Sequence, residues 1–115
     1  MTAREAMDWV DGKKHNVYSE ADKLHWLTRA EAMAGQLAER FGMVPAVLSL
    51  TPETELSIPA PWDQIYLRWL EAQIDYANQE YLKYNNAMAV FNALWSEYAN
   101  KTAREHLRPR RVYQF

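Results

Sequence analysis

The residues that could perform chemistry in this chain are three histidines and a short row of carboxylates. His15, His25 and His106 each lack a second histidine four residues away, and none belongs to a His-Glu-x-x-His arrangement. That arrangement places two zinc ligands on one face of a helix. The chain has no cysteine, which excludes thiolate metal ligands, disulfides and a cysteine nucleophile. We therefore expect no metal site and no cofactor.

Glu71, Asp75 and Glu80 follow one another along a segment with helical spacing, and two carboxylates on one helix face can act as acid and base. The same spacing is typical of a solvated face, on which Glu80 and Lys83 would pair at i, i+3. The sequence has three glycines and no phosphate loop, Gly-x-Ser-x-Gly turn or dinucleotide fingerprint. We favour the structural interpretation and expect that the protein is not an enzyme.

The segment that carries these carboxylates shows the strongest pattern in the chain. From residue 62 to residue 108 there is no Gly or Pro. Apolar residues recur there in steps of three and four: Leu67, Leu70, Ile74, Ala77, Tyr81, Tyr84, Met88, Phe91, Trp95 and Tyr98. This spacing predicts one long amphipathic helix of about 45 residues and about 65 Å. Asn85-Asn86 is its weakest point, where a kink or a break into two helices would fall.

Two shorter helices are predicted before the long one. Thr2 and Glu5 have the spacing of a capping box, which opens a helix that we expect to end near Val10. Ser19 opens a second helix, whose apolar stripe continues to Gly42. We therefore expect an all-α fold in which the two shorter helices pack antiparallel on the long helix.

The predicted helices are joined by a long interhelical loop at 43–60, longer than a helical hairpin needs. Its apolar pieces, 46–50 and 56–58, are bounded by prolines and could extend or pair as edge strands. We expect this loop to be an ordered intersubunit arm. Pro109 ends the last helix, so we expect a single helical domain at 1–107 and an extended C-terminal tail at 108–115.

The long helix carries a second aromatic stripe, rotated by about 100° from the first. Either this broad apolar arc contacts both shorter helices of its own chain, or part of it meets another subunit. The candidate intersubunit residues are Trp62, Tyr66, Trp69 and Tyr76 on the helix, with Val47, Leu48, Leu56 and Ile58 in the loop.

Basic residues gather near the C-terminus, opposed only by Glu105: Lys101, Arg104, Arg108, Arg110 and Arg111. The first two lie near the predicted C-terminus of the long helix, where the negative end of the helix dipole stabilises cations. The others indicate a docking tail for a protein partner, contact with DNA phosphates, or a solvated end. The net charge of -2 argues against binding nucleic acid or anionic lipid over the whole surface. No apolar run is long enough to span a membrane.

Short pieces distributed along most of the chain carry a family resemblance. They are Trp9-Val10-Asp11, Asn16-Val17-Tyr18-Ser19-Glu20, Asp22-Lys23, Trp26-Leu27, Glu55-Leu56, Pro59-Ala60-Pro61-Trp62-Asp63, Ile65-Tyr66, Glu71-Ala72-Gln73-Ile74-Asp75-Tyr76 with Glu80, Tyr84-Asn85-Asn86-Ala87-Met88-Ala89, Phe91-Asn92 and Asn100-Lys101-Thr102. Together they resemble the small helical head-tail connector (adaptor, or neck) proteins of tailed bacteriophages and prophages. The chain departs from the family pattern at Ala103, where similar sequences have His.

The resemblance implies a non-enzymatic structural protein of the virion, assembled in the host bacterial cytoplasm, that forms a ring beneath the portal. By position, the arm would contact a neighbouring subunit, and the tail would dock on the portal through Arg108, Arg110, Arg111, Val112, Tyr113 and Phe115. The implied partners are further copies of the chain in the symmetry of the portal, the portal protein, other neck or tail-completion proteins and, non-specifically, DNA in the channel, but no membrane. The alternative is a small phage-encoded helical regulatory or DNA-binding protein, which would need a basic helix face.

Overall fold

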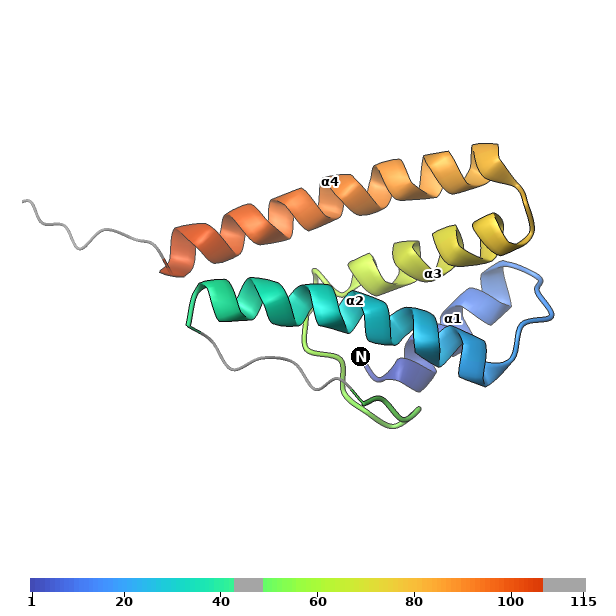
Figure 1. The fold of residues 1–115 in the computed structure, drawn as a ribbon, viewed down its shortest axis with the longest axis horizontal. Coiled ribbons are helices and arrows are strands. Elements are labelled where there is room, and N and C mark those ends of the chain that lie inside the picture. Colours follow the sequence, from blue (N-terminus) through green and yellow to red (C-terminus); the bar gives the residue numbers. More distant parts are fainter. Residues whose placement is uncertain (43–48, 107–115) are drawn as a thin grey trace, which may run out of the picture.

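The computed structural model describes residues 1–42 and 49–106, and this part of the chain forms four α-helices (Figure 1). They are α1 (Ala3–Lys13), α2 (Glu20–Arg40), α3 (Gln64–Ala77) and α4 (Tyr81–His106). The described residues contain no strand, and their one β-type contact is an isolated antiparallel bridge between Thr2 and Glu55. The prediction of an all-α fold is confirmed.

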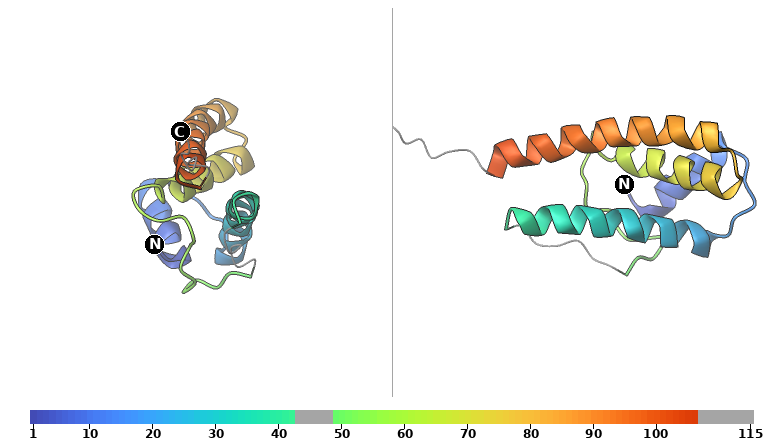
Figure 2. Two further views of the ribbon diagram at one scale, coloured as in Figure 1. Left: turned by 90° about the vertical axis from the view of Figure 1, so that its left-hand side faces the viewer. Right: turned by 45° about the horizontal axis from the view of Figure 1, so that its top comes forward.

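The prediction of a single long helix is wrong, because the chain reverses after Ala77 and α3 and α4 form an antiparallel hairpin (Figures 1 and 2). The reversal begins with a Schellman C-cap. The Glu80 amide donates to the Asp75 carbonyl at 2.8 Å, the Gln79 amide donates to the Tyr76 carbonyl at 2.9 Å, and Gln79 has a φ of 63°. Glycine is the usual residue at this left-handed position, so a glutamine gave no sequence signal.

The predicted weak point at Asn85-Asn86 is also wrong, since both residues lie inside α4. Two adjacent asparagines lower helix propensity only modestly, by well under 1 kcal/mol each. A left-handed residue that caps the preceding helix interrupts the helical path outright. The break therefore falls at 78–80, where the cap hydrogen bonds form.

The predicted starts of both shorter helices are confirmed. The Thr2 hydroxyl accepts from the Glu5 amide at 3.1 Å, and the Glu5 carboxylate accepts from the Thr2 amide at 2.8 Å, which is the reciprocal capping box. The Ser19 hydroxyl accepts from the Asp22 amide at 3.1 Å and caps α2. These local hydrogen bonds need no tertiary contact, and this is why they could be predicted.

The ends of the shorter helices follow the prediction less closely. The first helix continues past Val10 and through Gly12 to Lys13. A glycine costs a helix only about 1 kcal/mol, so it weakens a helix without ending it. The second helix ends at Arg40, two residues before the predicted cap at Gly42, and Gly42 has a φ of 74°, a conformation that glycine adopts easily.

The central element is α3, which contacts α1 and α2 on one side and α4 on the other (Figures 1 and 2). It runs antiparallel to α2 but not to α1, so the predicted antiparallel packing of both shorter helices is wrong for the first of them (Figure 1). Six of its apolar side chains are fully buried: Ile65, Tyr66, Leu67, Leu70, Ala72 and Ile74. By contrast, α4 packs mainly on α3 and buries only Phe91, Tyr98 and Thr102. The described residues extend over 60 × 30 × 19 Å, so the molecule is elongated.

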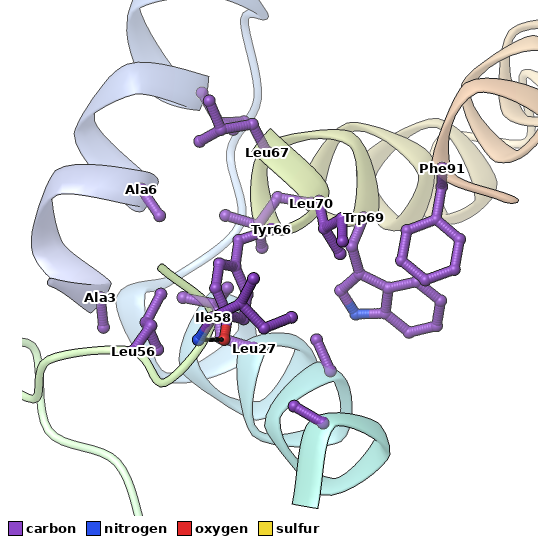
Figure 3. Packing of buried hydrophobic residues seen from close by; sticks show 14 of the residues in the cluster. Ala3, Ala6, Leu27, Leu56, Ile58, Tyr66, Leu67, Trp69, Leu70 and Phe91 are labelled. Atoms are coloured by element: carbon purple, nitrogen blue, oxygen red, sulfur yellow. Dashed lines mark hydrogen bonds between the residues drawn. The ribbon is translucent and has the colours of Figure 1, made fainter. Parts of the chain in front are cut away.

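The last part of the loop before α3 belongs to the core. Leu56 and Ile58 are buried close to Ala3 and Leu27 (Figure 3). The loop also completes α1, because the Ala3 amide donates to the Thr54 carbonyl at 3.0 Å and so satisfies a first-turn donor that a helix leaves unpaired. The loop is thus held to its own chain from residue 52 onward.

Candidate interaction surfaces

The aromatic stripe that begins at Trp62 divides between the core and the surface. Tyr66 and Trp69 are buried, Trp62 is half-buried, and Tyr76 is 56% exposed. Leu56 and Ile58 are buried as well. The structure therefore buries four of the six described candidate intersubunit side chains inside their own chain, which is the first of the two alternatives for the apolar arc. Val47 and Leu48 lie outside the described residues.

Trp69 shows why part of the aromatic stripe is buried within its own chain. Its indole N–H donates to the Trp26 carbonyl of α2 at 2.7 Å, and its ring lies 5.1 Å from the ring of Phe91 on α4 (Figure 3). One side chain of α3 therefore joins two other helices. This arrangement exists only because α4 folds back over α3, which the sequence pattern did not predict.

A buried carboxylate fixes the loop against α2 and α3. Glu31 is 1% exposed and accepts hydrogen bonds from the Ser57 amide at 3.1 Å, the Ser57 hydroxyl at 3.0 Å and the Tyr66 hydroxyl. The Tyr66 oxygen in turn accepts from the Ile58 amide at 2.9 Å (Figure 3). Burial, together with the hydrogen bond and negative charge of Glu31, raises the pKa of Tyr66 well above its usual range. We call Glu31, Ser57, Ile58 and Tyr66 the Glu31 cluster.

Two further charged groups are buried with a partner of opposite sign. The Lys14 ammonium lies 2.8 Å from Asp75 Oδ1, and the Lys23 ammonium lies 2.7 Å from Asp11 Oδ1. Desolvation works to raise the pKa of Asp11, but the hydrogen bonds from Lys23 and Asn16 outweigh it and hold the pKa below its usual range. Asp11 lies in α1 and Lys14 is its C-cap residue, so both pairs connect α1 to another helix. Nothing in the sequence spacing predicts them.

The carboxylates considered for acid and base chemistry point to separate cations. Asp75 pairs with Lys14, Glu71 with Arg68 at 2.9 Å, and Glu80 with Lys83 at 3.2 Å. The predicted i, i+3 pair of Glu80 and Lys83 is thereby confirmed. Within residues 1–42 and 49–106, no group of three His, Asp or Glu side chains could hold a metal ion.

The end of the molecule at the α3–α4 turn carries a basic hollow. A cavity of about 570 Å³ is lined there by Lys13, Lys14, His15, Asn78, Glu80 and Lys83. It adjoins the N-terminus of α4, where the helix dipole is positive. Sequence reasoning missed it, because α1 and the α3–α4 turn are far apart along the chain.

Next to this hollow, aromatic side chains reach the surface. Tyr76 packs edge-on against the rings of Tyr81 at 5.6 Å and Tyr84 at 5.1 Å. Tyr76 is 56% exposed and Tyr81 is 53% exposed. Exposed apolar groups gathered in one place often mark a protein contact. We call Tyr76, Tyr81 and Tyr84 the turn cluster.

The basic C-terminus is described only in part. Lys101 pairs with Glu105, four residues further along α4, at 3.4 Å. Arg104 lies in the last turn of α4, where the negative end of the helix dipole stabilises a cation. The predicted tail at 108–115 lies outside the described residues, and with it all the candidate portal-docking residues: Arg108, Arg110, Arg111, Val112, Tyr113 and Phe115.

None of the four described helices is long and apolar enough to cross a membrane. Comparison of the chain with models of protein families, with curated proteins and with solved structures finds no match.

Proposed function

We propose that this chain is a non-enzymatic structural adaptor, a subunit of the head-to-tail connector in the neck of a tailed phage. The observation that carries the proposal is the turn cluster, which presents aromatic side chains at one end of an elongated helical molecule. The charged groups that could perform chemistry pair with one another instead. A surface built this way suits contact with proteins better than turnover of a small substrate.

The positions of the resemblance residues support the same proposal. Asp11 accepts from Asn16 at 3.0 Å and from Lys23 at 2.7 Å, and the Tyr18 ring packs edge-on against Trp26 at 5.6 Å. These residues hold the connection between α1 and α2. Residues on which the resemblance rests thus help to hold this fold together.

In this proposal the subunits form a ring beneath the portal, in the symmetry of the portal, and the tail at 108–115 docks on the portal protein. Other neck or tail-completion proteins bind the opposite side of the ring, and DNA passes through without sequence-specific contact. The protein belongs to the virion and assembles in the host cytoplasm.

The test is co-sedimentation with the purified portal ring encoded by the same genome. We expect stoichiometric binding by the full-length chain and loss of binding by a chain that ends at Leu107. Replacing Lys101 with Gln removes one charge from the C-terminal part of α4 and serves as the control for charge alone. Absence of binding by the full-length chain, at concentrations where it is folded, contradicts the adaptor proposal.

The basic hollow is the observation that favours the second candidate, a DNA-binding or regulatory protein. In that case Lys13→Gln with Lys83→Gln should weaken binding to a duplex oligonucleotide, and the slope of log affinity against log salt should become shallower by about 2. Lys101→Gln, at the other end of α4, is the matched control. If the chain does not bind duplex DNA even at low salt, about 50 mM, the DNA-binding alternative is wrong.

A further inference from the structure

The basic hollow is a polar cavity between parts of the chain that are far apart in sequence. One wall is the end of α1 with residues 13–15, and the other is the α3–α4 turn and the start of α4, with Asn78, Glu80 and Lys83. Figure 1 shows both parts at the same end of the molecule. Its volume of about 570 Å³ is in the range of ligand sites. Because every lining side chain is polar, a ligand of this hollow must be polar too.

The charges of the lining favour an anion, since three lysines line the hollow with one glutamate. Lys14 bonds to Asp75 at 2.8 Å and Lys83 to Glu80 at 3.2 Å. An ammonium group has three donors, so each of these lysines keeps donors for a ligand. Lys13 has no acidic partner within residues 1–42 and 49–106. The hollow therefore carries a surplus of positive charge.

Uncharged donors add to the second wall. The Tyr18 hydroxyl donates to Asn78 Oδ1 at 2.6 Å, and the amide nitrogen of the Asn78 side chain has no hydrogen-bond partner in the described part of the chain. The backbone amides of residues 81–83 also have no acceptor there, as the first turn of a helix leaves them. The helix dipole is positive at the same place. An anion in the hollow can accept from these groups as well as from the lysines.

A second, smaller hollow of about 290 Å³ adjoins the first and shares Lys14 and Lys83 with it. Its lining includes Arg68, whose Nε is the one buried side-chain nitrogen or oxygen without a hydrogen-bond partner among the described residues. A buried donor without an acceptor is uncommon and costly. An unused donor in the adjoining wall indicates the same shortage of acceptors as the basic hollow does.

We propose that the basic hollow binds a phosphate group with more than one negative charge, either as the free ion or as a monoester. The group is held between the lysines at the end of α1 and the first turn of α4. Phosphate suits the hollow better than a carboxylate, because its additional oxygens can accept from both walls at once. This inference does not rest on the proposed function, since it requires neither a ring nor a portal.

The test is a titration of the isotope-labelled chain with inorganic phosphate, followed through amide shifts in two-dimensional NMR. Sodium chloride keeps the ionic strength at about 0.15 M, so that distant charges are screened throughout. We expect saturable shifts at residues 81–83 and at His15. Acetate at equal concentration should shift these amides much less. Shifts that do not saturate, or that acetate reproduces in full, would overturn the proposal.

Charge variants identify the groups that hold the ion. Lys13→Gln and Lys83→Gln should each weaken phosphate binding about fivefold, the effect of one charge about 4 Å away in a water-like medium. Glu80→Gln should strengthen it by a similar factor, because it removes the one carboxylate of the lining and releases Lys83. Lys101→Gln and Glu97→Gln, in the C-terminal half of α4, are the matched controls and should leave the affinity unchanged. Equal effects of Lys13→Gln and Lys101→Gln would show that the attraction is not specific to the hollow.

The source of the phosphate is distinguished by two further probes. Glycerol 3-phosphate, a monoester, should shift the same amides if the hollow accepts a phosphate that is attached to a larger molecule. Shifts with inorganic phosphate alone restrict the site to the free ion. A duplex oligonucleotide without terminal phosphates offers only diesters. If the duplex shifts residues 81–83 and inorganic phosphate does not, the hollow is a DNA contact and the phosphate proposal is wrong. The adaptor proposal stands or falls separately, by co-sedimentation with the portal.

Discussion

At the scale of single residues, Glu31 places a carboxylate in the core, and its hydrogen bonds all come from uncharged groups, namely the Ser57 amide and hydroxyl and the Tyr66 hydroxyl. A buried carboxylate is costly unless its oxygens are satisfied. These bonds also satisfy the donors of the loop, so the Glu31 cluster determines how residues 57–58 lie on α2 and α3.

Replacing Glu31 with Ala should lower the free energy of unfolding by about 3 kcal/mol, because it leaves the buried Tyr66 hydroxyl without its acceptor and removes the hydrogen bonds that hold Ser57. Urea denaturation measures the change. Glu39→Ala, at an exposed position of the same helix, should change stability by about 0.5 kcal/mol or less. Equal losses in the two variants would show that the Glu31 cluster contributes nothing specific.

The raised pKa of Tyr66 makes stability depend on alkaline pH. Because an unfolded tyrosine titrates near pH 10, the contribution of Tyr66 to stability is fully present below about pH 10. Above that pH the unfolded chain releases the proton first, so the contribution is lost at up to about 1.4 kcal/mol per pH unit. We expect the stability of Tyr66→Phe to fall less steeply between pH 10 and 11.5 than that of the unchanged chain. Parallel curves from urea denaturation would contradict this expectation.

At the scale of elements, the turn between α3 and α4 decides the architecture. The left-handed Gln79 and two cap hydrogen bonds convert a continuous apolar pattern into a hairpin. A residue other than glycine in this conformation carries a cost of about 1–2 kcal/mol. The chain tolerates that cost because folding back buries Trp69 and Phe91 against each other.

Gln79→Gly should therefore stabilise the protein by about 0.5–1 kcal/mol, since glycine adopts positive φ without strain and the gain exceeds its larger unfolded-state entropy. The same exchange at Gln36, an exposed helical position of α2, should destabilise by about 0.5–1 kcal/mol. The opposite signs, measured by thermal or urea denaturation, distinguish a left-handed turn from a continuous helix. If both variants are destabilised alike, the helix is continuous at residue 79.

At the scale of the whole molecule, burial is uneven. Three helices contact α3, whereas α4 rests mainly on α3 and buries few of its side chains. Hydrogen exchange should therefore be slowest in α3 and faster in α4, because local opening follows the number of buried contacts. Most fully buried side chains belong to α1, α2, α3 and the loop before α3, and α4 joins them through a long pairing with α3, the most extensive contact between helices in the described residues.

Phe91→Ala tests this view, because it removes the buried ring that joins α4 to Trp69. We expect a loss of about 3–4 kcal/mol in the stability of α4, with amide exchange of α4 greatly accelerated and that of α3 changed less. Val90→Ala, at the exposed neighbour, should leave exchange nearly unchanged. Uniform acceleration in all four helices would show that α4 unfolds only together with the rest.

The sequence alone determined the features that depend on neighbouring residues: the capping box at Thr2 and Glu5, the Ser19 cap, the all-helical content, and the i, i+3 pair of Glu80 and Lys83. The resemblance supplied the proposed function, and the candidate docking tail lies outside the described residues. Only the tertiary structure decided that the long apolar pattern folds back on itself. It also brought together Glu31 with Ser57, Lys14 with Asp75, and the residues of the basic hollow.

The physical reason lies in the range of the interactions. A cap or an i, i+3 pair is complete within one turn of helix, so its residue types and spacing suffice to predict it. A helical stripe specifies that a face will be buried but not what will cover it. In this chain α1, α2 and α4 all pack on α3. Which face of α3 each helix covers depends on contacts between residues tens of positions apart, such as Trp26 with Trp69.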